Sequence, residues 1–289
     1  MMTIPELAAE SLGGFLATDM HRAFGSSHAR LTEIIPSVAR LALECIGNSD
    51  ALYHDVEHTM LVTLVGRDIL RGRGLLVRTT ASDWAHLLGA CLLHDIGYVR
   101  GLLAGDRENE FVIDDDGKTV FLARGASDAA LAAHHVDRSK LFALERIAEI
   151  ELLDEKRIAR AIECTRFPAD EEGQIHEEGA LLRAADLIGQ LGDPRYLQKA
   201  NALFWEFEEI GWNKNFGYTS PADVVDHYPQ FYWNNVSPHI HTALRYLSVT
   251  ESGRQWISNL YSNVYRAERS IGQTLPTLKG SAAESNNGK

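Results

Sequence analysis

The chain has 289 residues, 45% of them hydrophobic, so it can bury a sizeable core as one large domain or two small ones. Its 40 acidic residues outnumber its 28 basic residues and give a formal net charge of −12, which disfavours long nucleic acids as partners because two polyanions repel each other. No segment reaches the roughly 18 apolar residues that a membrane helix needs, so we expect a cytoplasmic protein without a membrane partner.

Apolar residues recur at helical spacing through most of the chain, for example over residues 34–46 and 141–150. This periodicity predicts an all-α fold. Polar capping residues precede predicted helices over 53–69 and 84–94. Gly72 and Gly97 stand where those two helices are expected to end.

One segment departs from the helical pattern. Residues 111–113 and 119–121 are short apolar runs on either side of Asp116-Gly117, which is a favourable pair for a hairpin turn. We therefore expect a short β-hairpin near residues 111–121. The charged run from 106 to 116 reads either as a rim over a pocket or as a solvated loop.

The end of the chain, residues 273–289, is rich in Gly, Ser, Asn and Ala and has no periodicity. Such a composition predicts a disordered tail. We find no internal repeat and no interdomain linker before it, so residues 1–272 are expected to form a single domain.

Histidine and aspartate residues within apolar helical runs form the main chemical signal. His54 and His58 lie four residues apart, which would place both imidazoles on one face of a helix. His94 and Asp95 are adjacent at the end of an apolar helix, and Asp186 is a lone carboxylate within residues 181–188. A buried carboxylate needs a cation or a strong donor as its partner.

These residues supply a mixed set of nitrogen and oxygen ligands, His58, His94, Asp95 and Asp186. Such a set suits Mn, Fe, Zn, Co or Mg, and its carboxylates argue against a closed structural zinc site. The sequence therefore predicts a centre for one or two divalent ions.

The order of these ligands resembles that of the HD superfamily of metal-dependent phosphohydrolases. The similarity runs from His58 to Asp186 and includes a His-Asp-Ile-Gly segment and a later Ala-Ala-Asp segment. The resemblance implies an HD-type helical bundle as the single catalytic domain over residues 1–272, with helical extensions at both ends. It also implies that Asp95 takes part in catalysis by joining two ions where two are bound.

Within that superfamily, the run Tyr-His-Asp-Val-Glu-His at residues 53–58 is similar to a segment of cyclic-nucleotide phosphodiesterases. This similarity implies that His54 donates a proton to the leaving oxygen while His58 binds metal. Asp55 stands where those enzymes usually have Asn, and the His-Asp-Ile-Gly segment lacks a further His found there. Gln230-Phe231 resembles their base-binding pair, although its spacing to the next proline differs.

Three further residues are candidates for substrate binding or a second metal. His134 and His135 follow a short helical stretch over residues 126–133, and only one of two helical neighbours can readily face a site, for which we favour His135. The alternative is a favourable charge at a helix C-terminus. Arg183 lies one turn before Asp186, where it could meet a phosphate or simply pair with an acidic residue.

We therefore expect a phosphohydrolase, most plausibly a phosphodiesterase acting on a cyclic nucleotide or a related small, nucleotide-like phosphate ester. A homodimer is compatible with this reading. One alternative is an HD-type di-iron oxygenase, for which His134 or His135 together with His176 would supply extra ligands. Another is a degenerate HD module used for binding or signalling.

Overall fold

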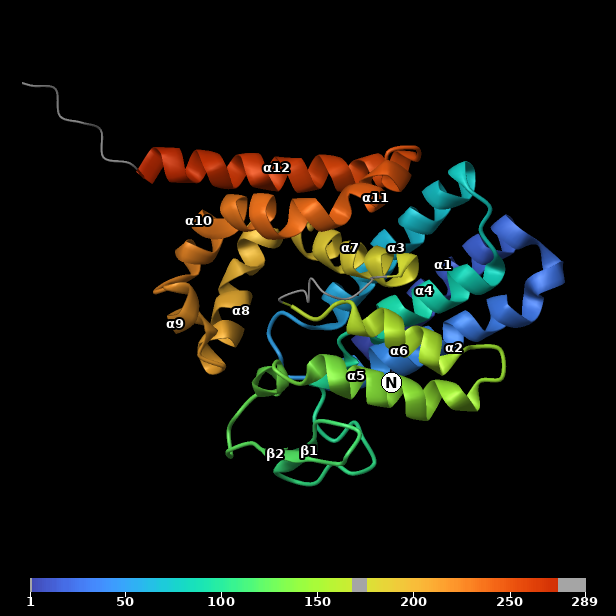
Figure 1. The fold of residues 1–289 in the computed structure, drawn as a ribbon, viewed down its shortest axis with the longest axis horizontal. Coiled ribbons are helices and arrows are strands. Elements are labelled where there is room, and N and C mark those ends of the chain that lie inside the picture. The colour runs from blue at the N-terminus through green and yellow to red at the C-terminus, as the bar shows by residue number, and fades with distance from the viewer. Residues whose placement is uncertain (1, 168–175, 275–289) are drawn as a thin grey trace, which may run out of the picture.

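The computed structural model of the chain describes residues 2–167 and 176–274. The fold is all-α with one short β-hairpin, as predicted (Figure 1). The α-helices are α1 Ile4–Phe24, α2 Ala29–Ile46, α3 Val56–Leu76, α4 Ala81–Leu93, α5 His135–Arg146, α6 Glu155–Glu163, α7 Glu177–Leu191, α8 Tyr196–Glu209, α9 Trp212–Phe216, α10 Pro221–Phe231, α11 Ser237–Leu247 and α12 Glu251–Thr274. Short 3-10 turns lie at Ser26–His28, Ile96–Tyr98, Asp128–Leu131 and Ile147–Glu149, and a π-helical turn lies at Tyr232–Val236.

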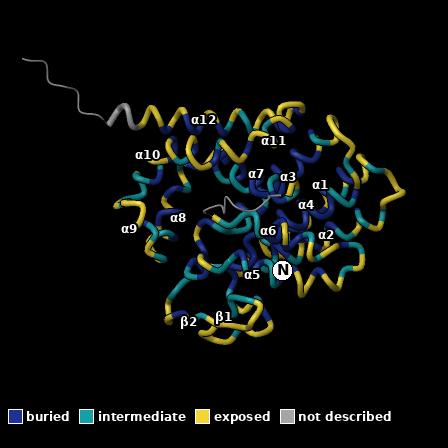
Figure 2. The backbone as a smooth tube through the Cα atoms, viewed as in Figure 1, coloured by how far each residue is buried: buried dark blue, intermediate teal, exposed yellow. Residues whose placement is uncertain are grey.

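Helices α3, α4 and α7 form the centre of the molecule, where buried backbone dominates (Figure 2). The α1–α2 pair packs on one side of this centre, and α5 and α6 cover another. Helix α11 crosses α3 and α7, and the long α12 lies outside it (Figure 1). One hydrophobic cluster runs from α1 to α12, so a single apolar core holds together the helices that carry the predicted site residues.

Helix α3, which carries His58, differs at both ends from the sequence prediction. Helix α3 starts at Val56 instead of residue 53, because the Asp55 side chain caps it by accepting the His58 backbone N–H at 2.9 Å. The helix passes through Gly72 and ends at Leu76. A Cβ atom at Gly72 would lie 1.8 Å from the carbonyl oxygen of Tyr246, so this glycine permits close helix packing instead of ending the helix.

Gly97 also has a packing role, in the 3-10 turn that follows α4. Helix α4 ends at Leu93 with His94 as its C-cap, close to the predicted end. A Cβ atom at Gly97 would lie 2.0 Å from the carbonyl oxygen of His135. The glycine therefore lets the turn after His94-Asp95 pack directly against the start of α5.

The predicted hairpin is present as the antiparallel pair β1 Glu110–Val112 and β2 Thr119–Phe121. Gly117 in its turn has a φ of 77°, a conformation that glycine adopts without strain. Arg138 of α5 anchors the segment: its guanidinium donates to the carbonyl oxygens of Gly97 at 2.7 Å and Val99 at 2.8 Å, and it pairs with Asp106 at 2.9 Å.

The structure describes only the first two residues of the segment 273–289, which was predicted to be a tail. Residues 273 and 274 still belong to α12, and the remaining part, 275–289, lies outside the described residues. In the parts of the chain that the structure describes, no helix combines the length and apolarity needed to cross a membrane.

Arg138 is fully buried, so replacing it tests whether it holds the turn after His94-Asp95 in place. We expect Arg138→Met to lower the free energy of unfolding by about 3–5 kcal/mol, because it leaves the buried Asp106 carboxylate without its partner. Urea unfolding followed by circular dichroism measures the change. Arg107→Met replaces an exposed residue next to Asp106 and should change the free energy of unfolding by less than about 0.5 kcal/mol. Equal effects of the two substitutions would contradict the anchoring role.

Candidate metal centre

Three central helices bring together the four predicted metal ligands. His58 lies in the first turn of α3, His94 caps the C-terminus of α4, Asp95 follows it, and Asp186 lies within α7. His94 Nδ1 is 2.8 Å from the carbonyl oxygen of Cys91, and a carbonyl only accepts, so Nδ1 carries the proton. In the neutral ring, Nε2 then presents a lone pair to the centre.

The ligand atoms are close enough to share one ion. His58 Nε2 lies 3.2 Å from Asp95 Oδ2 and 3.4 Å from Asp186 Oδ1. His94 Nε2 lies 3.1 Å from Asp95 Oδ2 and 3.6 Å from Asp186 Oδ1. Ligand atoms each about 2.0–2.2 Å from a common ion stand at such separations. His58, His94 and Asp186 therefore form a group that could hold a metal ion.

Burial makes this arrangement costly without a cation. His58 is 2% exposed and His94 is 0% exposed. Neither ring nitrogen of His58 nor Nε2 of His94 has a hydrogen-bond partner of suitable geometry among the described residues. Burial alone would raise the pKa of Asp95, but the two imidazoles hold it well below its usual range. Ionised carboxylates and unpartnered imidazole nitrogens meeting in one buried place fit a divalent ion.

His135, and not its neighbour, reaches the centre. His135 Nε2 lies 3.6 Å from Asp95 Oδ1, while Asp95 Oδ2 faces His58 and His94. The two oxygens of Asp95 thus face different histidines. His134 does not line the cavity described below. The short helical stretch predicted before this pair is the 3-10 turn Asp128–Leu131, and His135 is the first residue of α5, so His135 stands at the start of a helix and not at a C-terminus.

His54 also lies at the centre, but, contrary to the prediction, it is not on the helix that carries His58. It precedes α3, so it does not share a helix face with His58. Its Nδ1 lies 2.6 Å from Glu206 Oε2 of α8, and its ring stacks on Tyr98 with centroids 4.5 Å apart. Burial lowers the pKa of His54, yet the Glu206 charge and hydrogen bond outweigh it and raise the pKa to about 9.

This pairing favours a proton-donating role for His54. His54, His58 and Asp95 place one ligand atom each within 4.8 Å of one another, so His54 could also bind metal. A metal ligand must be unprotonated, however, and Glu206 stabilises the protonated ring. Glu206 thus engages Nδ1 of His54 and favours the protonated form of the ring.

Glu206 was missed in the sequence analysis. It is 4% exposed, and its Oε1 accepts the backbone N–H groups of Tyr53 at 2.7 Å and His54 at 3.2 Å. One signal was available in the sequence, because Glu206 is a charged residue within the apolar and aromatic run 203–207. Its partner, 152 residues earlier in the chain, could not be identified from that signal.

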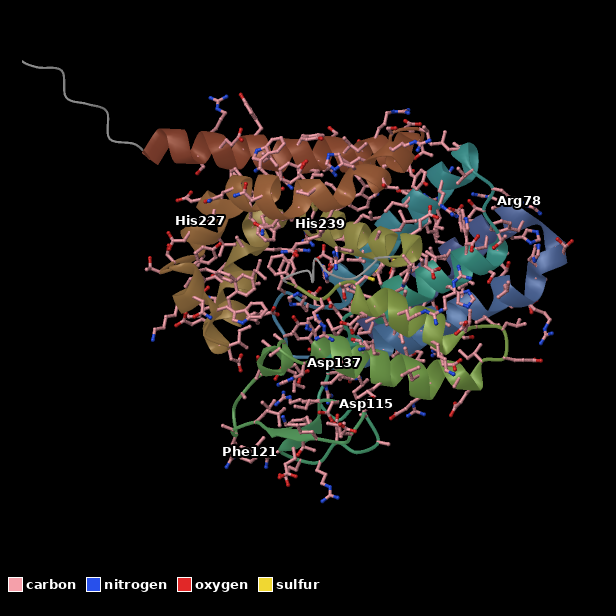
Figure 3. All side chains as sticks on the ribbon, in the orientation of Figure 1. Arg78, Asp115, Phe121, Asp137, His227 and His239 are labelled. Atoms are coloured by element: carbon pink, nitrogen blue, oxygen red, sulfur yellow. The ribbon has the colours of Figure 1, made fainter. Side chains whose placement is uncertain are left out.

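A cavity of about 660 Å³ opens beside these side chains. His54, Asp95, His135 and Asp186 line one part of it, together with Arg183. The remaining wall is mostly aromatic or amide in character and includes Phe207, Trp212, Phe216, Tyr218, Phe231, Gln190, Gln230, Asn234 and Asn235. Gln230-Phe231 therefore does face the cavity. Figure 3 marks two further lining residues, His227 on α10 and His239 on α11.

Two other side chains do not line this cavity. His176 caps α7 by accepting the Gly179 backbone N–H at 3.1 Å, and it lines a separate pocket of about 220 Å³ with Arg73 and Asp83. Arg100 pairs with Asp50 and Asp128, so it links segments that are distant in the sequence.

Comparison with known proteins assigns the chain to a family. A model of the family described as Npun_R2479-like matches residues 4–270, so the chain belongs to that family. A search of curated proteins found no match.

Substitution of one ligand tests the centre independently of any reaction. We expect the purified wild-type protein to retain a divalent transition metal. The Asp186→Asn variant and the His94→Gln variant should each lose most of it, because each substitution removes one ligand from a buried set. Elemental analysis after dialysis against chelator-free buffer measures the content. His134→Gln is the matched control and should keep wild-type content. Equal metal content in all variants would place any bound metal elsewhere.

Proposed function

We propose that this member of the Npun_R2479-like family is a metal-dependent phosphohydrolase that cleaves a phosphate ester of a small, nucleotide-like molecule. The observation that carries the proposal is the meeting of His58, His94, Asp95 and Asp186 beside His54, whose ring is paired with Glu206. The resemblance of these residues to the HD superfamily supports the same reaction class.

A bound divalent ion supplies two things that phosphate ester hydrolysis needs: neutralisation of phosphoryl oxygens and a water molecule whose pKa is lowered towards about 7. His58, His94, Asp95 and Asp186 are the residues that would hold it. One oxygen of Asp95 faces His58 and His94, and the other faces His135. This arrangement is compatible with a second ion beside the first.

His54 provides the proton that the leaving oxygen requires. Because Nδ1 is engaged by Glu206, the proton available to a substrate is the one on Nε2. Tyr98 stacks on one face of the ring and so restricts its orientation. After transfer, Glu206 keeps the ring in the same place for reprotonation. A positioned general acid of this kind contributes about 10² to 10⁴ in rate.

The cavity suits an organic group on the phosphate. Its volume of about 660 Å³ lies within the range of small-molecule sites. Phe207, Trp212 and Phe231 offer aromatic surface for a flat ring, and Gln190 and Gln230 offer amides that can both donate and accept hydrogen bonds. These features favour a nucleotide-like substrate over a bare phosphate.

The di-iron oxygenase is less well supported. It requires two extra histidine ligands between His94-Asp95 and Asp186. Of the three candidates, His135 reaches the centre, whereas His134 does not line the cavity and His176 lines the other pocket. A degenerate binding module is also disfavoured, because all four ligands are retained and face one another.

A substrate panel tests the proposed reaction. The protein loaded with Mn, Fe, Mg or Zn is incubated with 3′,5′- and 2′,3′-cyclic nucleotides, dinucleotides and 5′-nucleotides, and phosphorus NMR follows the products. We expect cleavage of at least one class, and loss of that cleavage after metal removal. A yellow protein that consumes O₂ and leaves every phosphate ester intact would contradict the proposal.

The His54–Glu206 pair predicts a specific pH dependence. A general acid acts only while protonated, so turnover should fall as pH rises through the pKa of His54, about 9. Glu206→Gln removes the charge that raises this pKa, so the alkaline fall should move to lower pH. His54→Asn should lower kcat by about 10² to 10⁴ and abolish this fall.

Steady-state rates over a range of pH, with metal content measured on the same samples, check this prediction. Glu209→Gln makes the same change at an exposed position of α8 and should keep the wild-type profile. A His54→Asn protein with normal metal content and normal turnover would remove the proton-donor role.

A further inference from the structure

Arg183 of α7 is a buried cation for which no partner acid is found among the described residues. Only 8% of the residue is exposed. Its Nε donates to the carbonyl oxygen of Cys164, but Nη1 is buried without a hydrogen-bond partner. Arg138, the other deeply buried arginine discussed above, is paired with Asp106. A buried guanidinium without an anion is unfavourable, so its presence points to an anionic ligand.

The position of Arg183 places that ligand next to the metal centre. Arg183 precedes Asp186 by three residues on α7, so the two side chains leave the same helix face with their Cβ atoms about 5–6 Å apart. Both residues line the 660 Å³ cavity. An anion bound by Arg183 would therefore be a second anionic group, next to the phosphate at the metal ligands and separate from it.

A second arginine of the cavity wall has a different environment. Arg166 also lines the cavity, but its guanidinium is shared with Glu163 at 2.6 Å and Asp137 at 2.7 Å. These two carboxylates already compensate its charge. Arg183 is thus the better anchor for a substrate anion.

We propose that Arg183 is a recognition site for a second oxyanion, a phosphate or a carboxylate, on the molecule whose phosphate ester lies at the metal ligands. The inference rests on the proposed function and narrows its substrate class. A planar guanidinium matches the two oxygens of a phosphate or carboxylate. Because Arg183 and Asp186 lie one helical turn apart and line the same cavity, one small substrate can reach both residues. Substrates with a single anionic group are then weaker ligands.

Three phosphonates that cannot be hydrolysed separate this site from the reacting group. Methylphosphonate carries one oxyanion, phosphonoacetate adds a carboxylate, and methylenebisphosphonate adds a second phosphonate. Calorimetric titration of the Mn-loaded full-length protein gives their dissociation constants, and elemental analysis after each titration verifies that the metal stays bound. The proteins compared are wild type, Arg183→Met, Arg183→Lys and Arg160→Met, the last removing an exposed arginine of α6 as control.

We expect the wild type to prefer at least one of the two probes with two anionic groups over methylphosphonate. Arg183→Met should weaken that probe by about 10- to 100-fold, the range for loss of a charge-assisted hydrogen bond, while methylphosphonate changes less than about threefold. Arg183→Lys should lie between them, and Arg160→Met should match wild type. The probe that is affected identifies the second group as carboxylate or phosphate.

Two results would overturn the inference. In one, wild type binds no probe with two anionic groups better than methylphosphonate, a result that does not depend on how any variant folds. In the other, Arg183→Met and Arg183→Lys either change no affinity or weaken methylphosphonate as much as the other probes, which would place Arg183 on the reacting group. Arg183-dependent binding without hydrolysis of any ester would refute only the proposed reaction. Hydrolysis without Arg183-dependent binding would refute only this inference.

Discussion

The meeting of two carboxylates with two unpartnered imidazole nitrogens at the junction of α3, α4 and α7 is the constraint on which the rest of the structure depends. His58 and His94 are buried, and Asp95 is buried with them, so polar groups that water would normally solvate face one another inside an apolar core. Burying these polar groups together is unfavourable unless a cation binds between them. The surrounding fold serves to hold these atoms within about 3–4 Å of one another.

Several features far apart in the sequence contribute to this geometry. Asp55 caps α3 and so fixes the turn that carries His58. Gly97 allows the segment after His94-Asp95 to pack against α5, and the buried Arg138 ties that segment to the hairpin loop. Because α5 begins at His135, the same contact brings a third imidazole to Asp95. Packing and site geometry are therefore coupled at this corner of the core.

The sequence was sufficient for the all-α fold, the hairpin and the His and Asp residues that meet between the central helices, because each leaves a local signal. Helical periodicity marks the helices, Asp116-Gly117 marks the turn, and a lone Asp186 within an apolar run marks a carboxylate that needs a partner. The helix ends were less predictable. Asp55 looked like part of a helix although it caps one, and Gly72 looked like a helix end although it permits contact with Tyr246.

Contacts of the surrounding residues with distant segments could not be predicted. Glu206 meets His54 across 152 residues, Arg183 donates to the carbonyl oxygen of Cys164, and α8, α9 and α10 contribute to the cavity wall. No local pattern encodes these distances. These are nevertheless the contacts from which the proposed roles of His54 and Arg183 are inferred.

The most direct measurement is anomalous X-ray diffraction from crystals grown with Mn, recorded above and below the metal absorption edge. The account predicts an anomalous peak within about 2.0–2.3 Å of His58 Nε2, His94 Nε2 and a carboxylate oxygen of Asp95 or Asp186. An absence of any peak at these atoms in crystals soaked with Mn, Fe and Zn in turn would contradict it.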